Sequence, residues 1–342
     1  MVFIRADSNS TISGGHIMRC LAIAKSVMGA GENVCFLLAD DNPIPILQDA
    51  GLDYIVLDSD WQDLMSDVYQ VKEIVQHDKN PLLLIDTYSV TRQYVEALRP
   101  FTKIAYLGSK REYLGNLDLL INYSTDIDYD FYNKYYSSNT TLLLGPSYAP
   151  LREEFQQVRK DYRNNILRVL LTTGNTDKNN LVDMILKKLL PLVEQTDIVF
   201  DVVVGRMFDE KDYLHETYDD NKNVHLHENV KSMSLLMREC DLAISANGTT
   251  VYELSAIGLP TITFAMVPEQ VRSAEALSQL GVIDYCGRIY EDKENCVEFL
   301  KNRFTYYMRH NDDMISLAKK AHAIIDGNGC KKIGEEIFRL VK

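Results

Sequence analysis

The sequence predicts an α/β fold made of two open parallel-sheet lobes that face a cleft, followed by a C-terminal helical tail. Three observations predict it. The chain has 342 residues, 46% of them hydrophobic, and this length favours two domains over one. Short runs of Val, Ile and Leu alternate with longer amphipathic stretches, which is typical of βα units around a parallel sheet buried on both faces. After a polar, tyrosine-rich interruption the same alternation begins again.

The first lobe is predicted to span residues 1–145. Its first helix candidate, residues 15–31, places apolar residues from Ile17 to Met28 on one face, and two glycines suit its C-terminal end. The stretch 125–140 is polar, has no clean period and is predicted to be a long surface loop. Buried strands are expected at VFIRA (2–6), VCFLLAD (34–40), YIVLD (54–58), LLLIDTY (82–88) and KIAYLG (103–108).

The rest of the chain is predicted to form a hinge, a second lobe and a tail. Residues 146–165 contain prolines and many charges and form the hinge. Residues 166–290 form the second lobe, and residues 291–342 form helices, the last of which could pack back onto the first lobe. Strands are expected at LRVLLTTGN (167–175), DIVFDVVVG (197–205), NVHLHEN (223–229), DLAISANG (241–248) and PTITFAM (260–266).

Charge and composition exclude several classes of protein. The net charge is −13 and no basic run exists, so nucleic acid is not an expected partner. The 6 cysteines are spread out with no metal-binding spacing, as expected of reduced packing thiols. No apolar stretch has the length of a membrane span, and no targeting segment is apparent. We expect a cytoplasmic protein with no integral membrane association and no metal or other cofactor, while the oligomeric state stays open.

A histidine stands where the first predicted strand meets the first helix. Ligands of open α/β sheets collect at the carboxyl ends of the strands, so residues just after strands are candidates. His16 follows Gly14 and Gly15, which permit tight backbone geometry and close approach of a ligand. A helix N-terminus disfavours imidazolium, so a neutral ring there can serve as a general base. The alternative, that His16 caps the helix or fills space, stays open.

Two further candidates end the strand LLLIDTY. Asp86 and Tyr88 would reach the same cleft, where Asp86 could orient a base or hold a sugar hydroxyl. Capping of the following helix is an equal alternative for Asp86, because Asp serves well at that position.

The stretch 241–270 carries the strongest indication of a nucleotide site. A polar turn follows its first strand, and the amides that open the next helix suit a diphosphate. Glu253 lies one turn into that helix, where a carboxylate can accept both hydroxyls of a ribose. The alternative is a capped helix with a solvated glutamate. The other candidates in the turn and at the later cleft rim are Asn247, Gly248, Thr249, Thr250, Glu269 and Gln270.

Two weaker patterns lie elsewhere in the second lobe. Gly174 and Asn175 follow a strand and could belong to a phosphate or sugar loop, or to an ordinary turn. His225 and His227 share one face of a strand, but no third ligand is apparent, so a metal site is not favoured.

These motifs resemble those of a known family. FIRADSNSTISGGHIMRC (3–20) is similar to the family's F-R-x-D-S-x-x-x-x-G-x-G-H-x-x-R opening, LIDTY (84–88) to its I-D-x-Y, and GPSYAPLREEF (145–155) to its hinge. The family comprises the UDP-sugar hydrolases of pseudaminic acid biosynthesis, which cleave UDP-2,4-diacetamido-2,4,6-trideoxy-β-L-altropyranose, and the related spore-coat polysaccharide proteins. The resemblance spans about residues 1–285. It implies two Rossmann-like lobes in the glycosyltransferase-B fold, shared with the peptidoglycan N-acetylglucosaminyl transferase.

The resemblance also implies roles for single residues. His16 takes the place of the catalytic histidine and Arg19 that of its partner, while Asp7 belongs to the opening motif and is expected to bind substrate. Tyr88 is placed beside the reacting sugar. Glu253 is implied as the ribose ligand, and the amides near Gly248 and Thr249 as diphosphate ligands.

The chain departs from the family at three places, so the sugar stays open. Thr173 replaces the first glycine of a G-G-x-D motif, Glu269-Gln270 replaces Asn-Gln, and YLGSKREY (106–113) replaces an aspartate-rich segment.

The implied activity is hydrolysis of a UDP-sugar by a water that His16 activates, with UDP held in the second lobe. One alternative is a glycosyltransferase of the same fold, in which an acceptor hydroxyl replaces the water. Another is a nucleotide-sugar binding protein without chemistry, against which the intact GGHIMR stretch argues.

Overall fold

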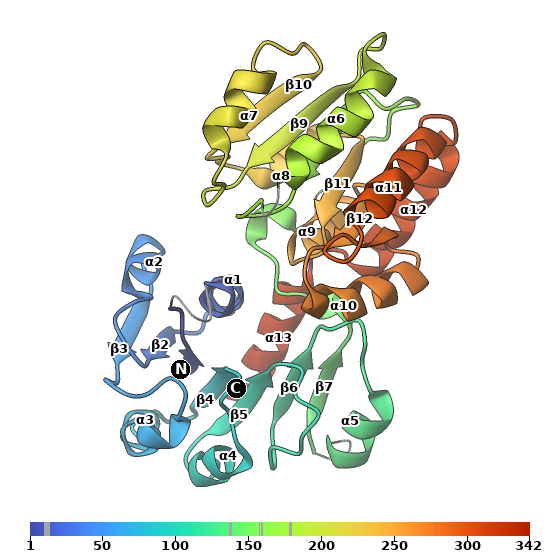
Figure 1. The fold of residues 1–342 in the computed structure, drawn as a ribbon. Coiled ribbons are helices and arrows are strands. Elements are labelled where there is room, and N and C mark those ends of the chain that lie inside the picture. The colour runs from blue at the N-terminus through green and yellow to red at the C-terminus, as the bar shows by residue number, and fades with distance from the viewer. Residues whose placement is uncertain (10–13, 137–138, 157, 159, 178–179) are drawn as a thin grey trace. The chain divides into compact units, whose positions relative to one another are not determined.

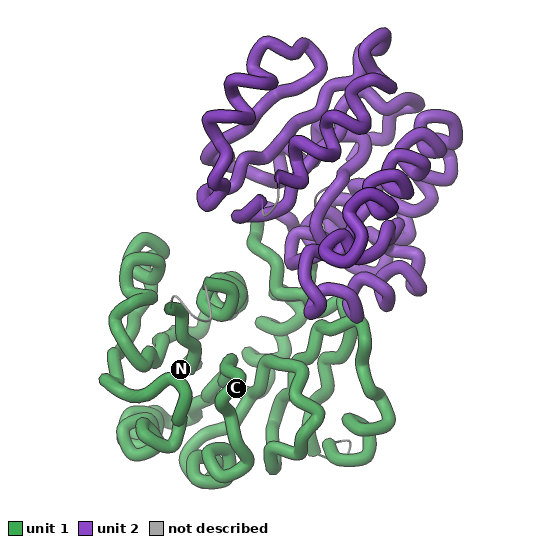
Figure 2. Tube along the Cα trace, in the orientation of Figure 1, with its two compact units in different colours: residues 1–153, 328–342 green, residues 154–327 purple. Residues whose placement is uncertain are grey.

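A computed structural model describes the chain at residues 1–9, 14–136, 139–156, 158, 160–177 and 180–342. It forms two compact units, unit 1 with residues 1–153 and 328–342 and unit 2 with residues 154–327 (Figure 2). The predicted loop between the first strand and the first helix includes residues 10–13, which lie outside the described residues.

Unit 1 is built on one parallel sheet with the strand order β3-β2-β1-β4-β5-β6-β7 (Figure 1). The order reverses beside β1, which pairs with both β2 and β4. Because β1 and β4 are buried along their whole length, they appear in the sequence as unbroken apolar runs. The five strands predicted for this part of the chain are confirmed, whereas β6 and β7 were not predicted. The strands of unit 1 are β1 (Val2–Ala6), β2 (Val34–Leu38), β3 (Asp53–Val56), β4 (Leu82–Asp86), β5 (Lys103–Leu107), β6 (Leu119–Asn122) and β7 (Thr141–Leu144).

Helices cover both faces of this sheet. Residues of α1 and α13 form one apolar core with it, and residues of α3, α4 and α5 form the other. The helices of unit 1 are α1 (Gly15–Gly29), α2 (Ile44–Asp49), α3 (Val68–Val75), α4 (Arg92–Leu98), α5 (Tyr129–Tyr136) and α13 (Gly329–Val341), with the 3₁₀ turns η1 (Leu64–Ser66) and η2 (Pro146–Tyr148).

The prediction of a surface loop over residues 125–140 is wrong, because α5 lies within it. Tyr132 and Tyr136 are one turn apart and both are buried in the core of unit 1. The Tyr136 hydroxyl accepts from the Leu114 amide over 2.8 Å, and Asp128 accepts from the Phe131 amide over 2.9 Å at the start of the helix. Tyrosine gives a weak apolar signal, so its burial through hydrogen-bonded hydroxyls does not appear as a period in the sequence.

The C-terminal helix α13 packs against α1 in unit 1. A Cβ atom at Gly334 would lie 2.6 Å from Ser26 Oγ, so the glycine allows the two helices to approach closely. One face assignment in α1 is wrong: Met28 is 44% exposed and Val27 is buried instead.

Unit 2 has a second parallel sheet with the order β10-β9-β8-β11-β12-β13. The five strands predicted for it are confirmed, and β13 was missed because only one of its five residues is buried. The strands are β8 (Arg168–Thr172), β9 (Val199–Val204), β10 (Val224–Glu228), β11 (Leu242–Ala246), β12 (Thr261–Ala265) and β13 (Asp284–Arg288). The helices are α6 (Leu181–Val193), α7 (Lys211–Tyr218), α8 (Met233–Glu239), α9 (Thr250–Ile257), α10 (Pro268–Gln279), α11 (Lys293–Tyr307) and α12 (Asn311–Ile324), and the chain enters unit 2 through η3 (Glu153–Phe155).

Both sheets share the strand order 3-2-1-4-5-6 when their strands are counted within each unit, and unit 1 adds a seventh strand. In such sheets ligands bind outside the carboxyl ends of the strands where the order reverses. The structure therefore points to the ends of β1 and β4 in unit 1, and to those of β8 and β11 in unit 2. Among the described helices, none combines the length and apolar character that a membrane crossing requires.

Candidate functional site

His16 is the second residue of α1 and lies against the carboxyl end of β4. Its Nδ1 is 2.7 Å from Oδ1 of Asp86, the last residue of β4. Both residues are buried, His16 to 5% and Asp86 to 1% exposure. Since β1, which leads into α1, is the neighbour of β4 where the strand order reverses, the structure brings two predicted residues together at the expected place.

Arg19 holds the same carboxylate from α1. Its Nε donates to Asp86 Oδ2 over 2.6 Å, its Nη2 donates to Oδ1, and its Nη1 donates to the Tyr123 hydroxyl over 3.0 Å. Burial acts to raise the pKa of Asp86, but the charge of Arg19 and the hydrogen bonds from Arg19 and His16 outweigh it. The pKa of Asp86 therefore lies below its usual value, and the carboxyl is ionised at neutral pH.

The hydrogen bonds place a proton on Nδ1 of His16. An ionised carboxylate only accepts, so the short contact with Asp86 requires the proton on Nδ1. Arg19 Nη2 also lies 2.9 Å from this nitrogen, but a protonated Nδ1 has no lone pair to accept with, so this contact is not a hydrogen bond and Nη2 donates to Asp86 Oδ1. In the neutral ring with this proton, Nε2 carries the lone pair, and it can accept a proton from a nucleophile as a base oriented by a carboxylate does.

A small cavity lies beside His16 within unit 1. The Tyr88 ring stands edge-on to the His16 ring, with centroids 4.7 Å apart and planes at 85°. Tyr88 is 68% exposed, so most of this ring faces solvent. The residues that line the cavity are Asp7, His16, Trp61, Asp86, Thr87 and Tyr88.

Asp7 borders this cavity, but its carboxylate is engaged inside the protein. One oxygen accepts from Arg5 Nη1, and the other accepts from the Ala39 amide over 2.8 Å. Arg5 is fully buried and also donates to Asp67 over 2.9 Å. Asp7 thus ties β1 to the segment after β2, and Arg5 ties it to the segment after β3, while the role of Asp7 in substrate binding stays a prediction.

Gly14 and Gly15 adopt ordinary backbone conformations. Gly14 has φ −85° and ψ 1°, and neither glycine is in the left-handed region. The tight geometry expected of this pair is therefore not seen. A Cβ atom at Gly15 would meet no atom of the described residues within 4 Å.

Trp61 is the wall of this cavity that sequence reasoning missed. It lies in the segment between β3 and η1, and so follows a strand of unit 1 as His16 does. The rule that ligand-binding residues follow strands could have found it, but the segment carries no motif that distinguishes it from an ordinary connection.

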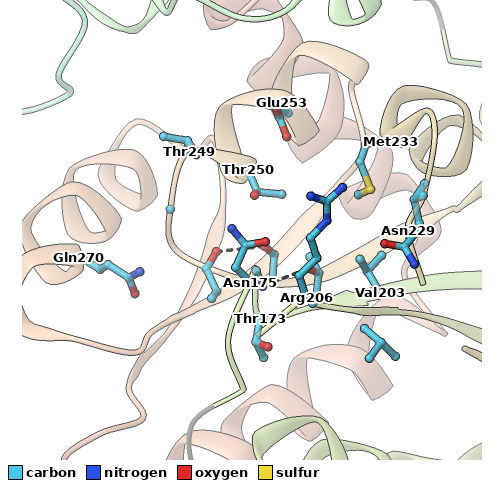
Figure 3. Close-up of a pocket in the computed structure, with 18 residues that line it drawn as sticks. Thr173, Asn175, Val203, Arg206, Asn229, Met233, Thr249, Thr250, Glu253 and Gln270 are labelled. Atoms are coloured by element: carbon cyan, nitrogen blue, oxygen red, sulfur yellow. Dashed lines mark hydrogen bonds between the residues drawn. The ribbon is translucent and has the colours of Figure 1, made fainter. Parts of the chain in front are cut away.

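A larger pocket lies in unit 2 at the carboxyl ends of its central strands (Figure 3). Its volume is about 400 Å³, within the range of small-molecule sites. Residues that follow β8 and β11 form two of its walls, and these two strands are neighbours where the order reverses. Its position in unit 2 thus matches the position of His16 and Asp86 in unit 1.

Most of the predicted second-lobe residues line this pocket, and two do not. Asn247 is 3% exposed and its Nδ2 donates to the Gln270 backbone oxygen over 2.9 Å. Glu269 is exposed in the first turn of α10. The predicted residues that line the pocket are Gly174, Asn175, Gly248, Thr249, Thr250, Glu253 and Gln270.

The start of α9 gives the pocket an anion-binding end. Thr249 precedes the helix and makes no side-chain cap bond, so its side chain does not compete with an anion at the helix N-terminus. The amides of Val251 and Tyr252 donate to the Gly248 and Thr249 oxygens within the first turn. Figure 3 shows Glu253 and Thr250 on the same helix, on its pocket side. The start of α9 can therefore accommodate a diphosphate together with a pair of hydroxyls that the Glu253 carboxylate binds.

Among the pocket residues that were not predicted, three have long or polar side chains that could contact a ligand. Arg206 follows β9 after Gly205, Asn229 follows β10 and Met233 opens α8. In Figure 3 the guanidinium of Arg206 points toward the side of the pocket that Glu253 and Met233 line. The strand before Arg206 was predicted, so the same rule about strand ends could have identified this cation.

Gly205 explains how two loops of the pocket come together. A Cβ atom at this position would lie 2.4 Å from the Gly174 oxygen and 2.6 Å from the Asn175 oxygen. These are backbone atoms, which cannot move aside as a flexible side chain can. Glycine is therefore required for the segment after β9 to contact the loop after β8.

His225 and His227 form no metal site with their neighbours. Nε2 of His227 is 2.8 Å from Oδ1 of Asp201, a fully buried residue in the middle of β9, and Arg168 binds both oxygens of the same carboxylate over 2.7 Å. Burial acts to raise the pKa of Asp201, but the hydrogen bonds from His227 and Arg168 and the charges of both lower it to about 2. Among the described residues, no group of three or more His, Cys, Asp or Glu could hold a metal ion.

Comparisons with known proteins agree with the motifs. The family model LpxB, described as lipid-A-disaccharide synthetase, matches residues 146–337. The spore coat polysaccharide biosynthesis protein SpsG of Bacillus subtilis is 23% identical over 97% of this chain and 96% of its own. The UDP-2,4-diacetamido-2,4,6-trideoxy-β-L-altropyranose hydrolase of Campylobacter jejuni is 27% identical over 53% of this chain and 62% of its own.

The solved structures show the fold. The glycotransferase of kitacinnamycin superimposes with a TM-score of 0.69 at 13% identity, covering 100% of this chain and 99% of its own. The predicted glycosyltransferase-B fold is confirmed, and so is the resemblance to the hydrolase and spore-coat proteins.

Proposed function

The chain belongs to the lipid-A-disaccharide synthetase family, and on this premise we propose that it hydrolyses a UDP-linked acetamido-deoxy sugar to UDP and the free sugar. The observation that carries the proposal is the pairing of His16 with Asp86 at the strand reversal of unit 1. A protein that only binds nucleotide sugars has no need of an oriented base there. We place the reaction in the synthesis of a nonulosonic acid or a surface polysaccharide, in keeping with the names of the relatives.

The proposed reaction balances with the groups that the chain supplies. The oxygen of a water forms a bond to the anomeric carbon, and its proton passes to Nε2 of His16. The bond between the anomeric carbon and the oxygen of the β-phosphate breaks, and its electron pair leaves with UDP. Asp86 stabilises the imidazolium that forms, because it is ionised and already accepts from Nδ1.

We assign the UDP moiety to the pocket of unit 2. The amides that open α9 would receive the diphosphate, and Glu253 would accept from the ribose hydroxyls. Arg206 adds the positive charge that a leaving diphosphate requires in a chain whose net charge is −13.

The decisive experiment supplies UDP-2,4-diacetamido-2,4,6-trideoxy-β-L-altropyranose without any acceptor in water enriched in ¹⁸O. We expect UDP release with the label in the sugar and none in UDP, since the water attacks carbon. Label in UDP would mean that the phosphorus–oxygen bond breaks instead. A parallel screen of other UDP- and CMP-linked acetamido sugars would define the sugar.

Glycosyl transfer is the second candidate, because the family is named for a synthetase. The same residues would then take the proton from an acceptor hydroxyl in place of water. Strict dependence of UDP release on an added acceptor would favour transfer, and release without one favours hydrolysis.

The pocket assignment predicts a loss of UDP affinity in Glu253→Ala. Hydrogen bonds to a charged group contribute about 1.5–3 kcal/mol, so the dissociation constant for UDP should rise about tenfold to a hundredfold. Calorimetric titration of UDP measures it. Glu216→Ala is the matched control, since Glu216 is an exposed glutamate of α7 that does not line the pocket. Equal affinities in the two variants would remove Glu253 from the nucleotide site.

A further inference from the structure

The cavity beside His16 is very small. Its volume is about 10 Å³, close to the least space that holds one water molecule. It lies within unit 1, between residues that follow β1, β3 and β4. The nucleophile that reaches Nε2 of His16 through this space must therefore be small.

The walls of the cavity are of two kinds. His16, Asp86 and Thr87 supply polar atoms to the lining, and Trp61 and Tyr88 supply aromatic rings. A water molecule can form hydrogen bonds with the polar residues and is small enough for a space of about 10 Å³. A sugar or alcohol hydroxyl brings carbon atoms with it, for which a cavity of this volume has no room.

The segment that carries Trp61 is fixed by hydrogen bonds. The Ser59 amide donates to the Ala39 oxygen over 3.0 Å, and the Ser59 hydroxyl donates to Asp67 over 3.4 Å. The Gln62 amide donates to Asp60 over 2.8 Å, which closes a turn around the tryptophan. The backbone that carries Trp61 is therefore fixed, and most of the surface of this residue is buried in the protein.

The same hydrogen bonds connect the segment of Trp61 to Asp7, which also lines the cavity. Asp67, which accepts from Ser59, also accepts from the buried Arg5, and Arg5 donates to Asp7. The Ala39 residue that receives the Ser59 amide donates its own amide to Asp7. One network thus joins the segment that carries Trp61 to Asp7.

We propose that Trp61 is a specificity-determining residue that restricts the nucleophile at His16 to water, and so makes the enzyme a hydrolase on a glycosyltransferase fold. The inference rests on the proposed function. Without the Trp61 side chain, an alcohol could take the place of water in a reaction that balances in the same way. The alcohol oxygen bonds to the anomeric carbon, the hydroxyl proton passes to His16, and UDP leaves with the electron pair.

The test measures products formed from UDP-2,4-diacetamido-2,4,6-trideoxy-β-L-altropyranose in water that contains methanol. In the wild-type protein we expect free sugar with almost no methyl glycoside. Trp61→Ala should raise the ratio of methyl glycoside to free sugar about tenfold, the lower end of what one carbon is worth in a shaped pocket. Trp61→Phe keeps an aromatic wall and should return the ratio toward that of the wild type.

Tyr69→Ala provides the control, because Tyr69 is a 79% exposed aromatic residue of α3 outside the cavity. It should keep the wild-type ratio. The ratio is measured within one reaction, so a loss of folded protein in a variant does not change it.

The outcomes separate the two proposals. If UDP is released normally but Trp61→Ala keeps the wild-type ratio, the role of Trp61 is wrong and hydrolysis stands. The role of Trp61 is also wrong, and hydrolysis again stands, if the wild-type protein already makes methyl glycoside in proportion to the methanol present. If the wild-type protein releases no UDP from this or any screened nucleotide sugar, the proposed function fails and the role of Trp61 falls with it.

Discussion

His16→Ala is expected to lose most of its turnover of the UDP-sugar while it still folds and binds UDP. General-base action contributes about 10² to 10⁴ in rate, and the loss should be of that size. The affinity for UDP should not change, because the nucleotide pocket is built from residues of unit 2 and His16 belongs to unit 1. UDP release under saturating substrate and calorimetric titration of UDP measure the two quantities.

His227→Ala is the matched control for this variant. His227 also contacts a buried aspartate that an arginine binds through both oxygens, but it lies in β10 and lines neither cavity. We expect it to keep its turnover. Turnover of His16→Ala near that of the wild type would remove His16 from the mechanism, and equal losses in both variants would indicate a loss of folded protein.

The two Asp-Arg-His groups show how far residue types alone can identify a site. Asp86, Arg19 and His16 have the same composition as the group around Asp201, and both carboxyls have a lowered pKa. What distinguishes them is position, since Asp86 ends its strand beside a cavity and Asp201 lies in the middle of β9. The sequence could indicate this difference, because strand ends are visible as the ends of apolar runs.

Fully buried parallel strands were the best predicted part of the fold. Their apolar runs are continuous, so the order of βα units and the residues after each strand followed from the sequence. The edge strand β13 and the tyrosine-rich helix α5 were missed because neither has a continuous apolar run. Their structure depends on tertiary contacts that local periodicity does not record.

The candidate site was predicted in part for the same reason. His16 and Asp86 follow neighbouring strands, so their contact could be expected from topology alone. Trp61 follows β3, which the sheet order separates from β4 by two strands. Its approach to His16 depends on the hydrogen bonds of the segment before η1, and nothing in the sequence encodes these as a recognisable pattern.

Asp86→Asn is expected to reduce turnover about as strongly as the loss of His16, by about 10² to 10⁴. An asparagine side chain has one acceptor atom and one donor group. Arg19 can only donate, so it takes the acceptor, and the amide group then faces Nδ1 of His16. That arrangement moves the imidazole proton to Nε2, where the lone pair is needed.

The same change should also lower stability, which makes its control important. Arg19 would keep its charge without an ionised partner, at a cost of about 3–5 kcal/mol for a buried pair and less here because its side chain is 20% exposed. Asp201→Asn removes the buried partner of Arg168, which keeps its ion pair with the exposed Glu239, and should lower the free energy of unfolding without the loss of turnover per folded molecule. If Asp86→Asn and Asp201→Asn reduced the turnover per folded molecule equally, Asp86 would act through stability alone.

The dependence on pH gives a further check on Asp86. Because its pKa is lowered in the folded protein, its ionised form stabilises the fold above the unfolded pKa of about 4, and this contribution is lost as the pH falls through the folded value. The stability difference between the wild type and Asp86→Asn should therefore be constant near neutral pH and shrink in acid below about pH 4. A difference that persists unchanged to low pH would mean that the carboxylate charge is not what holds Arg19 and His16, and the assigned tautomer of His16 would lose its basis.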